Sequence, residues 1–385
     1  MQEGNEYRLV GQVARKYNAL IGQNPYWNAT SGMGCFDASV DPIPLCTCFD
    51  LDLVRSELTS NFAMQNNIDF LRCNARIGAH GWNTGEGWLP IGAPSSVFSG
   101  NFDGQNNFIG NLFLHRPTFR SGFFREIDSS EINNLGFIAA NIHSESDDVG
   151  TVVGYSYRGL ITNSYVIGDI SGGGSRIGGL IGESYYGEIS NSYVIGTVSG
   201  LGSNSGGVGG LVGAGGMAEI KSSFFSGLVT GGSSTGTGIG GLGGDIGVIY
   251  DSYAIGVING REKVGGLVGQ GYVYNSFFIG NVTGSWEVGG LVGSGGEVMG
   301  SYAKGFVSGN SYVGGLNGAE FTTITMTNSY SETVISCSGT FCGGLIAGPA
   351  YMGSHTISNS YWINHTDDAF SCIGDGTNPA GCEAQ

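Results

Sequence analysis

The sequence is poor in charge and has no long hydrophobic run. Only 12% of its 385 residues are charged and 40% are hydrophobic, whereas disordered chains combine few apolar residues with high charge, so a folded protein is expected. Basic residues are fewer than acidic ones, 15 against 31, so the net charge is -16. This balance argues against nucleic acid and anionic membrane surfaces as partners, because both require basic patches. No stretch reaches the roughly eighteen consecutive apolar residues of a membrane span, so no membrane insertion is expected.

Cysteine is missing from the long middle of the chain. The eight cysteines stand in two groups, one before the repeats described below and one at their end. An even number grouped in this way indicates disulfide-stapled ends in an oxidising compartment, so an extracellular or cell-surface location is expected. Zinc is the alternative, but the spacing Cys46-Thr47-Cys48 is not the usual C-x2-C, and no histidine stands at a matching distance. The pairing stays open, and the expected disulfide cysteines are Cys35, Cys46, Cys48, Cys73, Cys337, Cys342, Cys372 and Cys382.

The beginning of the chain also lacks the apolar core of a secretory leader. Residues 1–5 are polar, and residues 7–21 carry Arg8, Arg15 and Lys16. A chain with oxidised cysteines and no leader is expected to be a mature form or a piece of a larger protein.

Helical patterns are confined to the N-terminal part. Apolar residues in 5–20 recur at helical spacing and predict a short helix within an end cap. A second helix is predicted over residues 51–62. The alternation that follows predicts a strand over residues 62–71.

Glycine is the residue in excess, with 73 copies but without the every-third-residue spacing of collagen. Residues 265–269 (GGLVG) recur as a motif, and most copies are followed by an apolar residue, a short polar stretch and an aromatic residue, often as Asn-Ser-Tyr. The units are 24 to 31 residues long, as from Gly265 to Gly289 and from Gly178 to Gly209. Self-similarity at such a period is typical of repeat architectures. The motif or a looser form of it begins at residues 150, 178, 209, 240, 265, 289, 314 and 343.

Each unit is too small to bury its own apolar side chains, so neighbouring units must stack and share a core. Helical repeats are excluded because glycine in a helix interior costs about 1 kcal/mol relative to alanine, and it recurs several times in each unit. Short apolar runs between tight glycine turns predict strands instead. The expected fold is all-β, a β-solenoid (β-helix) of about eight or more coils with strands about 4.8 Å apart, disulfide-stapled end caps and a short N-terminal helix.

Side-chain alternation predicts which residues face outward. The position before the closing Ser/Thr/Asn-Gly of a unit is apolar every time, as at Ile170, Val198 and Ile258, and is expected to point inward. The opposite parity includes Asp169 and Lys304 and is expected to face out. It also contains one aromatic residue per unit, and such a column could stack sugars, dock a protein or only stabilise its neighbours. The candidate binding face is Tyr165, Tyr193, Phe224, Tyr253, Phe277 and Tyr302.

The segment before the repeats resembles a known family. Residues 67–70 (NIDF), 87–92 (GWLPIG) and 98–112 (FSGNFDGQNNFIGNL) are similar to the entry segment of bacterial surface proteins with the GLUG motif. Asn106 and Asn107 replace the customary Gly-His. The resemblance covers residues from about 62 to about 365. It implies a β-solenoid in secreted or surface-anchored, adhesin-like proteins and in the non-catalytic region of immunoglobulin A proteases, and it implies no activity.

Catalytic and metal-binding patterns are sparse. The HExxH, GxSxG and phosphate-loop motifs are absent, and no cofactor or metal is expected. Glu188, Glu219 and Glu297 share one position of the repeat, and the first two fall on adjacent coils. Such a pair could raise a pKa or hold a cation, and otherwise forms a solvated turn.

These observations predict an N-terminal cap over residues 1–75, a GLUG-type solenoid over 76–365 and a C-terminal cap tail over 366–385. The expected function is a non-enzymatic binding or spacer module, adhesin-like, that presents an elongated repeat face to a glycan, to a protein or to other subunits. The alternative is a carbohydrate-active enzyme, a polysaccharide lyase or hydrolase with a groove along the coils.

Overall fold

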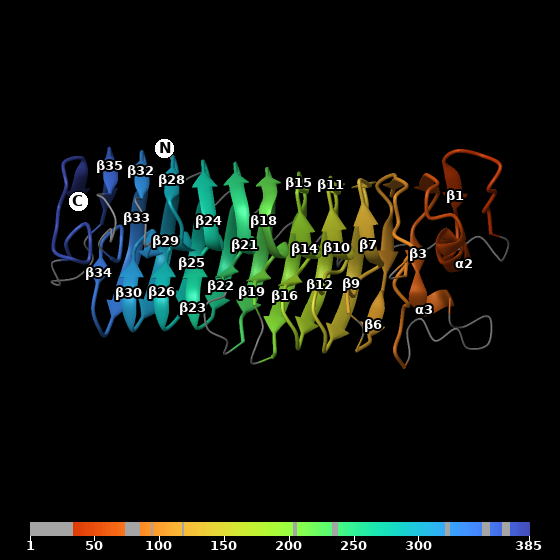
Figure 1. The fold of residues 1–385 in the computed structure, drawn as a ribbon, viewed down its shortest axis with the longest axis horizontal. Helices are drawn as coiled ribbons and strands as arrows, with labels where there is room; N and C mark the ends of the chain where they lie inside the picture. Colours follow the sequence, from red (N-terminus) through yellow and green to blue (C-terminus); the bar gives the residue numbers. More distant parts are fainter. Residues whose placement is uncertain are drawn as a thin grey trace.

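The chain forms a rod of stacked β-coils that follow one another in sequence order along the long axis (Figure 1). The computed structural model describes residues 34–73, 85–93, 95–117, 119–202, 206–232, 238–319, 324–348, 355–363 and 370–385. Within these ranges the rod has about nine turns, and its strands form parallel sheets of 17, 13 and 7 strands. The predicted β-solenoid is confirmed.

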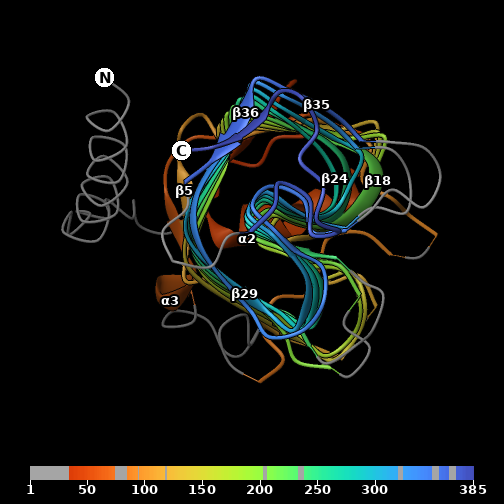
Figure 2. The ribbon, with the colours of Figure 1, turned by 90° about the vertical axis from the view of Figure 1, so that its left-hand side faces the viewer.

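One coil shows how the repeat folds. β17 (Val208–Gly209) belongs to the 7-stranded sheet, β18 (Val212–Lys221) to the 17-stranded sheet, and β19 (Phe224–Thr230) to the 13-stranded sheet. The next coil begins at β20 (Ile239–Gly240), which pairs in parallel with β17. Seen end on, successive coils superimpose around a shared interior (Figure 2).

The 17-stranded sheet contains the strand or strands that follow each glycine motif. Its members are β1 (Ile43–Leu45), β2 (Phe62–Met64), β4 (Phe102–Asp103), β7 (Phe124–Asp128), β8 (Glu131–Asn133), β10 (Val153–Tyr157), β11 (Leu160–Thr162), β14 (Ile181–Tyr185), β15 (Glu188–Ser190), β18, β21 (Gly243–Tyr250), β24 (Val268–Tyr274), β27 (Val292–Ser294), β28 (Glu297–Met299), β31 (Asn317–Ala319), β32 (Thr325–Thr327) and β35 (Thr356–Ser358).

The other two sheets complete the coils. The 13-stranded sheet consists of β3 (Ile68–Asp69), β5 (Phe108–Gly110), β6 (Phe113–His115), β9 (Gly136–Ser144), β12 (Tyr165–Gly172), β16 (Tyr193–Gly200), β19, β22 (Tyr253–Asn259), β25 (Phe277–Thr283), β29 (Tyr302–Gly309), β33 (Tyr330–Cys337), β36 (Ser360–Trp362) and β37 (Cys382–Ala384). The 7-stranded sheet consists of β13 (Ile177–Gly178), β17, β20, β23 (Glu262–Gly265), β26 (Trp286–Gly289), β30 (Ser311–Gly314) and β34 (Cys342–Gly343).

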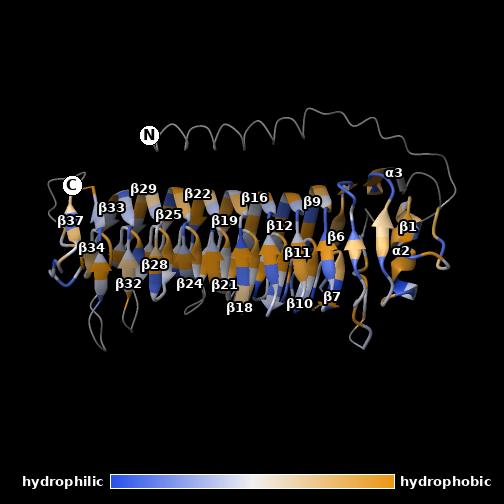
Figure 3. Ribbon diagram, turned by 90° about the horizontal axis from the view of Figure 1, so that it is seen from above, coloured by the Kyte–Doolittle hydropathy of each residue, from blue (hydrophilic) through white to orange (hydrophobic). Residues whose placement is uncertain are grey.

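One main hydrophobic core runs along the described part of the rod. The residues predicted to point inward are buried, as Val198 and Ile258 show, and they belong to one continuous cluster. Hydrophobic segments accordingly follow one another along the rod (Figure 3). Because each coil buries its apolar side chains against the next, the core depends on stacking rather than on any one unit.

Two glycine positions explain why the repeat needs this residue. Gly256 has a φ of +149°, and a Cβ there would stand 1.9 Å from the carbonyl oxygen of Gly227 on the preceding coil. Gly266 lies against the inward ring of Phe278, whose Cγ would be 2.4 Å from an added Cβ. Glycine therefore lets the backbone of one coil approach its neighbour and the core more closely than any side chain would allow.

The helices near the start differ from the prediction. The predicted helix over residues 5–20 lies outside the described residues. The helix predicted over 51–62 is wrong in its bounds, since α2 (Cys48–Leu53) and the 3-10 turn η1 (Val54–Ser56) occupy this part. Thr47 sets the earlier start, because its side chain accepts from the backbone N–H of Asp50 in a reciprocal capping box.

The strand predicted over residues 62–71 is also shorter than expected. It is broken into β2, β3 and the short helix α3 (Phe70–Cys73). The break between β2 and β3 is held by Asn66, whose side-chain amide donates to the carbonyl of Cys46 and to that of Asn67. Such side-chain to backbone bonds compete with strand pairing.

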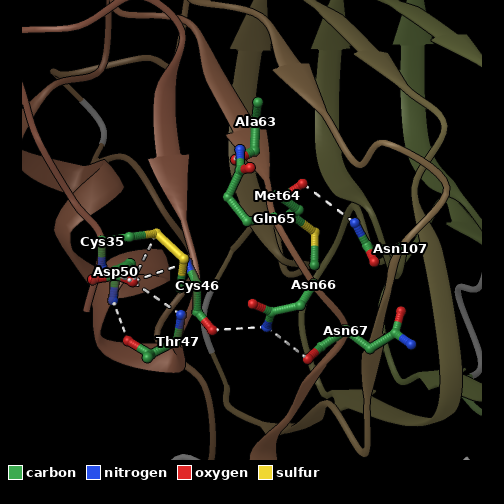
Figure 4. Close-up of a disulfide and its surroundings, with 10 residues drawn as sticks. All are labelled: Cys35, Cys46, Thr47, Asp50, Ala63, Met64, Gln65, Asn66, Asn67 and Asn107. Atoms are coloured by element: carbon green, nitrogen blue, oxygen red, sulfur yellow. Dashed lines mark hydrogen bonds between the residues drawn. A yellow bond between two sulfur atoms is a disulfide. The ribbon is translucent and has the colours of Figure 1, made fainter. Parts of the chain in front are cut away.

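The disulfides staple both ends, as predicted. Within the described residues, disulfides join cysteines of the same group, namely Cys35–Cys46, Cys337–Cys342 and Cys372–Cys382. Cys48 is also disulfide-bonded. At the N-terminal end the buried carboxylate of Asp50 lies beside the first disulfide and accepts three backbone N–H bonds, from Cys35, Cys46 and Thr47 (Figure 4). The loop that bears the disulfide is therefore anchored to the start of α2.

Candidate functional site

The turn into the 13-stranded sheet explains the Asn-Ser-aromatic pattern. Asn191 has a φ of +50°, a left-handed conformation that asparagine tolerates better than most residues. The serine that follows it is buried and bonded in two directions. In one coil the hydroxyl of Ser252 accepts from the N–H of Ser223, 3.1 Å away, and donates to the carbonyl of Tyr250, 2.6 Å away. The equivalent serines Ser164, Ser192, Ser223, Ser252, Ser276, Ser301, Ser329 and Ser360 form a buried serine ladder.

The next residue of each turn places a ring directly above the ring of the preceding coil. We call this row the aromatic ladder. Its tightest contact joins Tyr193 and Phe224, with centroids 4.7 Å apart and planes 2° apart, and its widest joins Tyr330 and Tyr361 at 5.2 Å and 6°. All six candidate residues lie in the aromatic ladder, which is Tyr165, Tyr193, Phe224, Tyr253, Phe277, Tyr302, Tyr330 and Tyr361.

The aromatic ladder lies on the side of its sheet away from the core, but it is closely packed. Tyr193 is 6% exposed, and Ile167 and Ile195 beside it are 7% exposed, forming a cluster separate from the core. Burial raises the pKa of Tyr253 to about 12 and raises the pKa of Tyr165 above its ordinary value. The hydroxyls of Tyr165 and Tyr253 therefore stay protonated further into the alkaline range than an ordinary tyrosine does.

Two further columns of outward side chains lie beside the aromatic ladder on the 13-stranded sheet. We call the aromatic ladder and these two columns together the outer face. One column contains Ile167, Ile195, Ile255 and Ile279, is interrupted by Ser226, and ends in an ion pair, Lys304 with Glu332 at 3.1 Å. The other column is mixed: it is apolar and exposed at Leu228, Phe306 and Val334, and polar at Asp169, Thr197 and Asn281. The outer face thus combines stacked rings with one mainly aliphatic column and one mixed column.

A network of opposite charges occupies another corner of the coils. Arg120, Asp148 and Arg176 stand at the same position of three successive coils, and Asp148 is completely buried. Arg176 donates to Asp148 and lies 3.3 Å from Glu183, while Arg120 pairs with Glu126. Burial raises the pKa of Asp148 and of Glu183, and the arginines oppose this shift. Because each of these charges has an opposite partner, the network leaves no arginine of this corner free for a ligand.

Two of the three glutamates singled out in the sequence lie together, and the third lies apart from them. Glu188 and Glu219 lie side by side on adjacent coils, as predicted, but the ammonium of Lys221 lies 2.9 Å from the first and 2.6 Å from the second. Glu297 is elsewhere and accepts a hydrogen bond from the hydroxyl of Tyr274. The sequence pattern did not predict the role of Lys221. Lys221 stands two residues after Glu219, so its side chain points to the same outward side of the strand. The pair is a neutralised turn rather than an open carboxylate site.

One group of potential metal ligands is found among the described residues, Cys35, Cys46 and Asp50. Its two sulfurs are joined in the disulfide and its carboxylate is occupied by backbone N–H groups, so it does not fit a metal ion. Among the described residues, no helix is both long and apolar enough to cross a bilayer.

A comparison with known protein families identifies the same repeat. Residues 173–199 match the family model of the GLUG motif. The chain carries the GLUG motif. In sequence it is similar to Halomucin from Haloquadratum walsbyi (strain DSM 16790 / HBSQ001), 33% identical over 172 residues that cover 40% of this chain and 2% of Halomucin. The chain therefore spans a very small part of that relative.

Among solved structures it is similar to the crystal structure of a putative immunoglobulin A1 protease from Bacteroides ovatus, with a TM-score of 0.48 and 19% sequence identity over 79% of each chain. In this chain the GLUG repeat is the structural unit of the coil: β13, β14, β15 and most of β16 fall within the matched residues.

Proposed function

We propose that the chain is a non-enzymatic, adhesin-like module of the extracellular space or cell surface that both spaces and binds. The observation that carries the proposal is the outer face, a continuous aromatic ladder beside a mainly aliphatic column and a column of mixed apolar and polar residues. Disulfides at both ends support an oxidising compartment. The partner is a glycan, a protein or another subunit that lies along the rod.

The length of the outer face supports a binding role. Eight strands about 4.8 Å apart extend roughly 40 Å along the rod. A long ligand would contact equivalent positions on several coils, so that single substitutions weaken binding little and combined ones weaken it strongly.

The test should change the outer face without removing the stacked rings. Ile255→Lys combined with Ile279→Lys does so, because Lys304 already stands in the same column of the native chain. The matched control adds the same charge elsewhere, at Leu89→Lys and Met217→Lys, which are 50% and 56% exposed.

Sedimentation and binding to glycan and protein arrays would be measured for the three proteins. We expect the outer-face variant to lose at least tenfold in affinity, about 1.4 kcal/mol, while the control variant and the β-sheet spectrum stay unchanged. Equal binding by wild type and the outer-face variant would refute the proposal.

The alternative function is a carbohydrate-active enzyme. The observation that favours it is the corner where Asp148 and Glu183, both with raised pKa, approach Arg176. The assay is turnover of a polysaccharide panel by the purified chain and by Glu183→Gln. If the wild-type chain turns over a polysaccharide and Glu183→Gln does not, the enzymatic function is favoured over the binding function.

A further inference from the structure

An exposed cluster on the 17-stranded sheet, distinct from the outer face, is not explained by stacking of the coils. It lies where β10 and β14 end and consists of Tyr157, Arg158, Tyr185 and Tyr186, which we call the aromatic corner. Tyr157 and Tyr185 are paired on adjacent coils. Tyr185 is 39% exposed and Tyr186 is 49% exposed, unlike the closely packed rings of the aromatic ladder.

The three rings form two surfaces at a right angle. Tyr157 and Tyr185 are nearly parallel, 14° apart in plane and 6.5 Å apart in centroid. The ring of Tyr186 is perpendicular to both, at 85° and 89°, with its centroid 4.8 Å from that of Tyr185. Tyr186 has a φ of +57°, a conformation that is unusual for a bulky residue. The equivalent residue two coils earlier is Ser129, so the turn itself does not require an aromatic side chain.

Arg158 gives the aromatic corner a positive charge that has no carboxylate partner among the described residues. Its guanidinium lies 5.0 Å from the ring centroid of Tyr157. Each other arginine whose side chain the structure describes has a carboxylate within 4 Å, whereas Arg158 forms no ion pair within this part of the chain. Glu188, which pairs in register with Leu160 two residues after Arg158, forms its ion pair with Lys221. An exposed arginine held over a ring is therefore available in a protein whose net charge is -16.

This combination has the chemistry of a site for an acidic sugar. The faces of tyrosine rings carry negative charge and attract the C–H groups of a sugar ring. A guanidinium offers a planar fork of donors that matches a carboxylate. The cluster is too small for a stable protein interface, which buries about 800 Å² on each partner. The negative charge of the whole protein disfavours a dense polyanion.

We propose that the aromatic corner binds a glycan that carries isolated carboxylate groups, as sialic acid or uronic acid residues do. The sugar ring packs against Tyr185 or Tyr186, and its carboxylate pairs with Arg158. This site is independent of the outer face and involves no chemical step.

The probes are sialyllactose and a hyaluronan hexasaccharide, with lactose and cellohexaose as neutral counterparts. Titration by calorimetry or by NMR of the tyrosine signals would compare wild type with Arg158→Asn, Tyr185→Ala and Tyr186→Asn. Asparagine is chosen for two of these positions because it tolerates their positive φ. Tyr272→Ala is the matched control, since Tyr272 is 46% exposed on the same sheet.

We expect an acidic probe to bind at least tenfold more tightly than its neutral counterpart, and each of the three substitutions in the aromatic corner to weaken binding at least tenfold. Tyr272→Ala and the outer-face variant should bind as wild type does, which separates this site from the proposed function. The proposal is overturned if neither acidic probe binds with a Kd below about 1 mM, if the neutral sugars bind equally well, or if only proteins bind at this corner.

Discussion

The aromatic ladder should stabilise the rod in proportion to the number of ring contacts that a residue makes. Tyr253 stacks on Phe224 at 5.0 Å and on Phe277 at 4.9 Å, whereas Tyr361 has a ring contact with Tyr330 alone among the described residues. Each stack is worth about 0.5–1.5 kcal/mol beyond the buried area. Tyr253→Ala is therefore expected to lower the free energy of unfolding by about 2–4 kcal/mol, and Tyr361→Ala by roughly half as much.

The assay is chemical denaturation followed by circular dichroism and by tyrosine fluorescence. Repeat proteins can unfold in parts, so agreement between the two probes must be shown before a free energy is quoted. Tyr272→Ala serves as the control, because no ring stacks on this exposed residue among the described residues, and surface changes usually stay within about 0.5 kcal/mol. If Tyr253→Ala cost no more than this control, ring stacking would not stabilise the coils.

The stacking energy of the rings limits which substitutions can be used to test binding. Replacing Tyr193, Tyr253 and Phe277 together removes every ladder contact from Tyr165 to Tyr302, or about 2.5–7.5 kcal/mol of stacking. A loss of that size is comparable to the whole stability of many domains. Loss of binding in such a variant would not distinguish a missing surface from a missing fold, and changes in the isoleucine column avoid this problem.

Three further predictions concern the backbone, the pH range and the turns. Gly256→Ala should destabilise the rod by about 3 kcal/mol or more, because its Cβ would meet the carbonyl of Gly227, whereas Gly216→Ala has open space and should be neutral in thermal unfolding. The pKa of Tyr253 is raised from 10.0 to about 12, so its contribution is complete below pH 10 and is lost as pH rises toward 12; alkaline denaturation of Tyr253→Phe should show a smaller loss. Ser252→Ala leaves a buried N–H and a carbonyl without their partner and should cost about 1–3 kcal/mol in urea denaturation, whereas a neutral result would show that water replaces the hydroxyl.

The regular part of the fold was predictable because two simple rules apply to every unit. Strand side chains alternate, so one apolar position such as Val198 identifies the inside, and the outward aromatic residues follow. Glycine at fixed places excludes helices and marks the turns. The stacking of the outward rings into one continuous row follows from the parallel register, which places Tyr193 on Tyr165 and Phe224 on Tyr193.

The ion pairs at the turns could not be predicted, because they depend on contacts between coils that the spacing of the repeats does not determine. The units vary between 24 and 31 residues, so side chains at the turns cannot be aligned by counting alone. The ion pairs of Lys221 with two glutamates arise from such cross-coil contacts. The early start of α2 depended on a local cap at Thr47, which a hydrophobic pattern does not reveal.

Repetition itself helps to separate structure from recognition. Stacking energetics account for a feature that recurs in nearly every coil, such as the serine ladder or the rings of the aromatic ladder, because each copy stabilises its neighbours. A feature found in one or two coils receives no such support. Tyr186 adopts a positive φ at an exposed turn, and Arg158, one coil away, forms no ion pair with the residues that the structure describes. Stacking gives no reason for either residue, so the aromatic corner is a more specific candidate for ligand recognition than the outer face, and the two can be tested independently.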